Sequence, residues 1–295
     1  MAKKEKKQPK PQKRRKPKKE QPQQYLLSPL NNPMLNYRVY VMGKSEKTLV
    51  RLVAFLLGGI VGLVFYGNLF MRDGVPTTMT HISNGAVFVI LGLLANKFVL
   101  PIYVENRLTA RSNILKQQFR SMLESLTSSF STGSNVQNAF ASALEDLKMQ
   151  YSENDFIVQE MQEIINGTRQ NISIEMMLRD FAQRSGNEDI ASFADVFEVC
   201  YRKGGNMNFV IHRTHTVMSD KMAVADEIET KLTSNKLQHN VMSIMPIIVV
   251  LMLRTTNEAF AVNFATPVGV LANTVAIGIF VGSYIYGNKI VAIKE

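Results

Sequence analysis

Four long apolar runs divide this chain, two before residue 105 and two after residue 240. They cover residues 49–70, 82–104, 241–253 and 267–286. As a helix rising 1.5 Å per residue, the first run would span about 33 Å, enough to cross the hydrocarbon core of a bilayer. Pro246 interrupts the third run, so we expect a broken, kinked span there. The pattern predicts four membrane-spanning helices arranged as two hairpins.

The segment between the hairpins has a different, polar character. Its apolar residues recur at helical spacing, and alternation of β-branched residues is scarce, so we expect no sheet in residues 105–240. Glycine and proline punctuate the helical patterns. We expect structural turns or breaks at Gly133, Gly167, Gly204, Gly205 and Pro246. The prediction for this segment is an all-α bundle of about six helices.

One stretch organises this bundle, DVFEVCYRKGGNMNFVIHRT at residues 195–214. A helical pattern enters it and ends at Gly204-Gly205, because two glycines adopt φ > 0 freely and let the chain double back. Asn206 then caps a second, longer helix that leads to the third apolar run. The exposed residues beside this turn, Arg202, Lys203 and Asn206, are our candidate surface for contact with a partner; an ordinary solvated turn is the alternative.

Two pairs of glycines within the apolar runs suit close packing of helices. Gly58 and Gly62 form one GxxxG pair, and Gly278 and Gly282 form another. Without side chains at these positions, a neighbouring helix can approach closely in a membrane. We expect both pairs to serve helix–helix packing, within the chain or in a homo- or hetero-oligomer.

Charge is concentrated at the N-terminus. The formal net charge is +10, and residues 1–48 alone hold 14 Lys/Arg against 3 Asp/Glu. We expect these residues to form a disordered basic tail, because their composition cannot bury a core. A solvated tail is one interpretation, and contact with anionic membrane lipids is the other. No aromatic residue interleaves with the first charges, so we do not expect nucleic acid as a partner.

The same charges predict the orientation of the spans. Basic residues flank the first span at its N-terminal side and gather at the ends of the second and fourth spans, whereas the connections after the first and third spans hold only Arg72 and Arg254. The positive-inside rule then places both termini and residues 105–240 in the cytoplasm. The expected organisation is a cytoplasmic tail (1–48), a hairpin of spans (49–104), a helical domain (105–240) and a second hairpin with a short cytoplasmic end (241–295).

We find no catalytic, cofactor or metal constellation in the sequence. Gly43-Lys44-Ser45 imitates the end of a P-loop, but Arg38 stands where the loop needs its first glycine, so we expect no nucleotide hydrolysis. His212 and His215 are spaced for one helix face, without further ligands at convincing spacing. Cys200, the single cysteine, lies on an apolar helix face and is best interpreted as a buried hydrophobic residue.

At this point the layout resembles a known family. From about Leu115 to the C-terminus the chain is similar to the type II secretion F-domain family, specifically the TadB-like or sister TadC-like platform proteins of Flp (tight-adherence) pilus assembly. The motifs that carry the resemblance are LESLTSSFSTGSNVQNAFASAL, SIEMMLRDFAQRSG, VFEVCYRKGGNMNFVIHRT, the proline of SIMPIIVVLML, and FATPVGVLANTVAIGIFVGSYIYGNKI. One F domain, where classical type II secretion platforms have two, favours the Tad branch.

This resemblance implies a non-enzymatic platform in the bacterial cytoplasmic (inner) membrane. Its implied partners are a cytoplasmic secretion ATPase, a sister F-domain platform protein and pilin subunits. The first rival class is a small-molecule transporter, which would need polar groups or broken helices in paired spans, where only Pro246 qualifies. The second is a membrane-anchored signalling protein, which would need a catalytic motif within residues 105–240.

Overall fold

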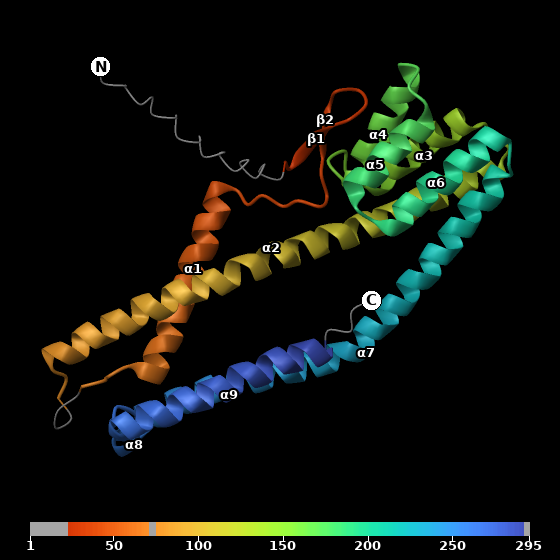
Figure 1. The fold of residues 1–295 in the computed structure, drawn as a ribbon. Coiled ribbons are helices and arrows are strands. Elements are labelled where there is room, and N and C mark those ends of the chain that lie inside the picture. Colours follow the sequence, from red (N-terminus) through yellow and green to blue (C-terminus); the bar gives the residue numbers. More distant parts are fainter. Residues whose placement is uncertain (1–22, 71–74, 292–295) are drawn as a thin grey trace, which may run out of the picture.

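The computed structural model describes residues 23–70 and 75–291, and within them the chain is overwhelmingly helical (Figure 1). A short antiparallel hairpin comes first, with β1 at Tyr25–Leu27 and β2 at Pro33–Leu35. The helices follow in this order: α1 Lys44–Tyr66, α2 Thr78–Ser131, α3 Val136–Gln150, α4 Phe156–Arg169, α5 Ile174–Ser185, α6 Glu188–Lys203, α7 Met207–Thr256, α8 Glu258–Phe264 and α9 Pro267–Val291.

Four helices are long and apolar enough to cross a membrane, as the hydrophobic pattern predicted. They are α1, α2, the Leu237–Thr256 part of α7, and the Pro267–Tyr284 part of α9. Few of their side chains are buried within the chain, which suits helices that face lipid. The chain is therefore an all-α, multi-pass membrane protein.

The spans and the helical domain (residues 105–240) share two uninterrupted helices. α2 runs from the first hairpin of spans into the helical domain, and α7 runs from the helical domain into the second (Figure 1). The expected boundaries near residues 104 and 240 therefore fall inside helices. Pro246 does not break α7, which continues past it to Thr256. Both hairpins project from one helical domain without a linker.

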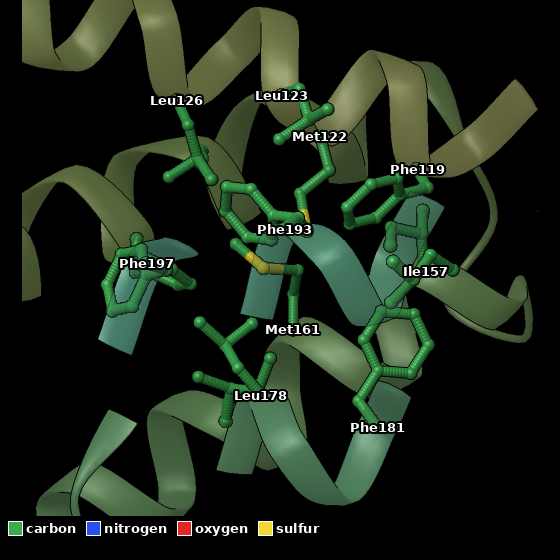
Figure 2. Close-up of a cluster of buried hydrophobic side chains, with 14 of the residues drawn as sticks. Phe119, Met122, Leu123, Leu126, Ile157, Met161, Leu178, Phe181, Phe193 and Phe197 are labelled. Carbon is green, nitrogen blue, oxygen red and sulfur yellow. The ribbon is translucent and has the colours of Figure 1, made fainter. Parts of the chain in front are cut away.

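The helical domain encloses the main hydrophobic core. The C-terminal part of α2, the N-terminal part of α7 and α3 to α6 give the expected six helices. Side chains less than 2% exposed meet at its centre from four of them (Figure 2): Phe119, Met122, Leu123, Leu126, Ile157, Met161, Leu178, Phe181, Phe193 and Phe197. Phe119 and Phe193 meet edge to face with ring centroids 5.5 Å apart, a favourable aromatic geometry. This core fixes how α2 and α7 leave the domain.

Two of the expected helix ends need correction. Gly133 follows the end of α2 with φ +80°, a value that suits glycine. Gly167, in contrast, does not end α4, which continues to Arg169; a Cβ there would lie 2.7 Å from the Sδ atom of Met177, so this glycine lets α5 pack closely. Ser134 with Gln137 has the spacing of a capping box and predicts the start of α3. The helix is capped by Asn135 instead, whose side chain accepts from the N–H of Asn138.

Part of the segment for which composition predicted disorder is folded. Residues 23–43, here called the N-terminal strap, fold onto the helical domain. Tyr37 is 5% exposed and packs edge to face on Phe156, with ring centroids 5.4 Å apart. The strap holds apolar and aromatic residues that can be buried, which explains why it folds against the domain. Residues 1–22 lie outside the described residues.

The first glycine pair lies where α1 and α2 cross. A Cβ built on Gly58 would lie 2.4 Å from the Cβ of Ala95, and one on Gly62 would lie 2.6 Å from Leu91. The GxxxG pair thus lets the two spans of the first hairpin touch. Gly278 and Gly282 on α9 differ, because nothing lies within 4 Å of a Cβ at either position. Within the described chain, the second pair packs no other helix.

Replacing Gly58 with leucine is expected to destabilise the protein by about 1–3 kcal/mol, because the new side chain overpacks the contact of α1 with α2. The matched control is Gly85→Leu on α2, where nothing lies within 4 Å. Thermal unfolding of both purified variants in detergent measures the difference. Equal melting temperatures for the two variants would show that this close approach does not hold the hairpin.

Candidate functional site

The turn between α6 and α7 has the geometry of a glycine cap. Gly204 has φ +71°, and its N–H donates to the carbonyl of Cys200, as does that of Gly205 at 2.8 Å. The side chain of Asn206 accepts from the N–H of Phe209 at 3.0 Å and caps α7. Of the two glycines, only Gly204 has a positive φ. A Cβ on Gly205 would lie 2.6 Å from Sγ of Cys200, which is buried, so Gly205 is required for space.

Two other candidate contact residues, Arg202 and Lys203, are exposed to solvent at this turn. Arg202 has a side chain 65% exposed, with its guanidinium 3.3 Å from Glu198 and 3.7 Å from Glu175. Lys203 is exposed as well. Asn206 has its side-chain oxygen engaged in the cap, so it contributes structure to the turn. The structure therefore brings two cationic side chains together at one accessible corner of the helical domain.

Exposed apolar side chains adjoin this corner. Val199 lies one turn before Lys203 on α6 and is 54% exposed, and Phe209, in the first turn of α7, is 67% exposed. Phe209 begins the helical pattern of α7 in the sequence, and the structure turns its side chain outward. Apolar side chains rimmed by charge outside the membrane are the usual composition of a protein-binding surface.

Substitutions at the two turn glycines are expected to destabilise the protein for different reasons. Gly204→Val puts a β-branched residue into a left-handed conformation and should destabilise the protein by about 1–2 kcal/mol. Gly205→Ala should destabilise it through contact with Cys200, and that loss should shrink when Cys200 is also alanine. A cycle of the single and double variants, followed by thermal unfolding, measures this coupling. Independent, additive losses would refute the contact.

A buried ion pair joins the N-terminal strap to the helical domain. The guanidinium of Arg184 on α5 donates two hydrogen bonds of 2.7 Å to the two carboxylate oxygens of Glu160 on α4, and a third to Asp180. The hydroxyl of Tyr37 donates to Glu160 at 3.0 Å, and Arg184 also donates to the carbonyl of Leu35. Burial, followed by the charge of Glu160, raises the pKa of Tyr37, so the phenol stays protonated and remains a donor.

Glu163 on α4 makes a second connection to the strap. Its carboxylate accepts from the hydroxyl of Ser28 at 2.5 Å and from the side-chain amide of Asn32 at 3.0 and 3.1 Å. Asn31 between them has φ 61°, a left-handed value that asparagine tolerates better than most residues. Because Glu160 and Glu163 both face the strap, α4 holds both the β1–β2 loop and the chain that follows β2.

The strap continues into a polar cluster where α1 begins. Glu46, in the first turn of α1, accepts from the hydroxyl of Tyr40 at 2.7 Å and from that of Tyr103 on α2 at 2.8 Å. Arg107 donates to the Tyr103 hydroxyl, and Arg111 donates to the carbonyl of Val39 at 3.2 Å. A carboxylate is also favoured at a helix N-terminus. The strap thus bonds to the helical domain at one end and to the first hairpin at the other.

The far ends of the spans meet at a third polar cluster. The guanidinium of Arg254 on α7 donates to the carbonyls of Leu63, Val64 and Gly67, with 3.0 Å to Leu63 and 2.7 Å to Gly67. The amide of Asn273 on α9 donates to the carbonyl of Phe65 at 2.7 Å. These carbonyls lie at the end of α1, where the last carbonyls of a helix lack donors from a following turn; that of Leu63 also accepts from the N–H of Gly67 at 2.8 Å. The second hairpin therefore caps the first.

These clusters connect parts of the chain and resemble no catalytic arrangement. In the described ranges, no group of three or more His, Cys, Asp and Glu side chains is placed to bind a metal. The hydroxyl of Thr216 lies 3.4 Å from Nδ1 of His212, and burial lowers the pKa of His215. Gly43 precedes α1 directly, and the residues before it belong to the strap. The polar contacts described above cap helix ends and form ion pairs, and they connect the two hairpins with the helical domain.

Sequence reasoning missed most of these polar contacts. In the sequence Arg254 counts only as a basic residue after the third span, and Asn273 lies inside the fourth apolar run. A signal existed for both, because an amide or a guanidinium within a span needs a buried partner. The partners themselves are backbone carbonyls, which carry no sequence signature.

No protein-family model, no curated protein and no solved structure matches this chain.

Proposed function

We propose that this chain is a non-enzymatic platform in the inner membrane of a bacterium, in a Flp/Tad-type pilus assembly machine. In this role it couples a cytoplasmic secretion ATPase to the extraction of pilin subunits from the membrane. Both termini and the helical domain face the cytoplasm. A sister F-domain protein, or further copies of this chain, completes the platform.

The single observation that supports the coupling role most is the continuity of α2 and α7. Each runs without interruption from the helical domain into a different hairpin of spans. A push or a rotation applied to the helical domain is therefore delivered to both hairpins. The N-terminal strap adds a further connection through Tyr37 and Glu46.

The corner at the α6–α7 turn supplies a surface for the ATPase. Lys203 and the ion-paired but exposed Arg202 lie beside exposed Val199 and Phe209, so the surface suits a partner with both charged and apolar groups. Arg202→Ala with Lys203→Ala is expected to weaken recruitment of the ATPase while leaving the unfolding temperature unchanged. If the double variant recruits the ATPase as well as the wild type does, the ATPase does not bind at this corner.

The rival functions receive less support from the structure. A transporter for a polar small molecule needs polar groups along a path through the membrane, whereas the cavity among α7, α8 and α9 is lined almost wholly by apolar side chains. A signalling enzyme needs a catalytic constellation in the helical domain, whereas the buried carboxylates Glu160 and Glu163 there are engaged with Arg184 and with the N-terminal strap. Neighbouring genes for a secretion ATPase, a second F-domain protein and a small prepilin would separate these classes.

Thiol labelling tests the proposed topology. In a Cys200→Ala background, a cysteine at Val75, between α1 and α2, is expected to react with an impermeant reagent added to intact cells. A cysteine at Glu153, between α3 and α4, is expected to react only after the cells are opened. Both positions are exposed to solvent. Labelling of the Glu153 position from outside would reject the topology and, with it, coupling to a cytoplasmic ATPase.

A further inference from the structure

A cavity of about 580 Å³ lies among α7, α8 and α9, beside the last turn of α1. This volume is within the range of about 300–1,000 Å³ that ligand sites in proteins occupy. Aromatic rings and small side chains form most of its wall: Phe65, Phe260, Phe264, Ala272, Ala276 and Phe280. Asn263 and Asn273 add polar atoms, and the amide of Asn273 is already bonded to the carbonyl of Phe65.

The cavity lies at the depth of the spans. Pro246 and Val250, which line it, belong to the apolar part of α7, and Ala272 to Phe280 belong to that of α9. The medium around these helices is lipid. Water gains little from an apolar cavity, because it finds too few hydrogen-bond partners there. A hydrocarbon chain from the bilayer therefore suits the cavity best.

A cation stands at the rim of this cavity. Arg254 lies one turn beyond Val250 on α7, and its Cζ atom is 5.6 Å from the centre of the Phe264 ring. Three of its five N–H groups donate to the end of α1. The Nε–H and one Nη2–H have no acceptor in the described ranges. Guanidinium groups bind phosphate oxygens well, so these two donors suit a phosphate.

We propose that this cavity binds one membrane phospholipid, with an acyl chain between α7 and α9 and the phosphate at Arg254. A spanning helix of a partner protein is the other candidate occupant. Helix α8 argues against it, because α8 joins the far ends of α7 and α9 and contributes Phe260 and Phe264 to the wall (Figure 1). A helix that crosses the whole bilayer would collide with α8, whereas an acyl chain whose phosphate lies at Arg254 runs from that end toward the middle of the bilayer and need not pass α8. This inference needs only the spans and does not rest on the pilus assembly role.

Native mass spectrometry of the full-length protein tests the proposal. The protein is released from detergent micelles that contain phosphatidylglycerol, and the lipid retained at increasing collision energy is counted. The wild type is expected to keep one phosphatidylglycerol after the other lipids are stripped. Ala276→Phe, which fills the cavity, is expected to reduce this species at least tenfold. Val275→Phe on the exposed face of α9 is the matched control and should keep it.

Additional variants and lipids test the phosphate contact and the cavity separately. Arg254→Gln should weaken retention of phosphatidylglycerol, and diacylglycerol, which lacks the phosphate, should be retained poorly by the wild type. If Ala276→Phe fails to fold, Ala272→Leu replaces it. A wild type that keeps no lipid, or equal retention by Ala276→Phe and Val275→Phe, would overturn the lipid site. A photo-reactive residue at Phe280 should capture lipid in membranes; capture of a protein there would assign the cavity to a partner helix.

Discussion

Replacing Arg184 with methionine is expected to destabilise the protein by about 3–5 kcal/mol, because the change leaves Glu160 buried without its partner. The Arg184 side chain is 2% exposed and that of Glu160 is 1% exposed. Arg184 also donates to Asp180 and to the strap carbonyl of Leu35, so one substitution removes contacts to two helices and the strap. Denaturant unfolding of the full-length protein in detergent, followed by circular dichroism, measures the loss.

Two controls separate this effect from general sensitivity. Tyr37→Phe removes a single hydrogen bond to Glu160 and should destabilise the protein by about 1 kcal/mol. Arg179→Met removes an ion pair with Glu198 in which Arg179 is 54% exposed, and it should change stability by less than about 1 kcal/mol. If Arg184→Met is no worse than Arg179→Met, the buried pair does not anchor the strap.

Replacing Arg254 with methionine is expected to separate the two hairpins at their far ends. The carbonyls of Val64 and Gly67 would lose their guanidinium donor at the end of a span, where an unsatisfied carbonyl costs several kcal/mol, while that of Leu63 would keep the N–H of Gly67. The loss falls on the contact between hairpins, because the core of the helical domain is remote from it. We expect a lower unfolding temperature and a wider gap between α1 and α9.

Cross-linking reports this gap directly. The hydroxyls of Tyr66 and Thr274 lie 3.0 Å apart, so cysteines at these positions should be bridged by a short bifunctional thiol reagent in a Cys200→Ala background. Arg254→Met should reduce the yield severalfold. Arg51→Met, which changes an exposed arginine near the start of α1, should leave it unchanged. An undiminished yield in Arg254→Met would show that α7 does not cap α1.

The sequence predicts the large elements well, and the reason is physical. The spans follow from runs of apolar residues, and the helices of the domain follow from apolar positions at helical spacing, both of which depend on local sequence. The pair Gly58 and Gly62 was sufficient to predict a close helix contact. Backbone freedom predicts the turn correctly at Gly204, whereas Gly205 is required for the space that Cys200 occupies.

The remaining features depend on partners distant in sequence. The strap folds because Tyr37 and Ser28 find Glu160 and Glu163, more than a hundred residues away. Gly167 looks like a helix end by composition, but Met177 of the next helix determines its role. The sequence also did not predict the full length of α2. Its apolar part and its amphipathic part have different patterns and suggest two elements, but in the structure they form one helix.

Deletion of the encoding gene tests the central claim most directly. Surface pili would be counted by electron microscopy, and pilin would be measured in the membrane fraction by immunoblotting. The platform role predicts that pili disappear while pilin accumulates in the membrane, and that the wild-type gene restores assembly whereas Arg254→Met does not. Normal pili in the deletion strain would contradict the claim that this chain couples an ATPase to pilin extraction.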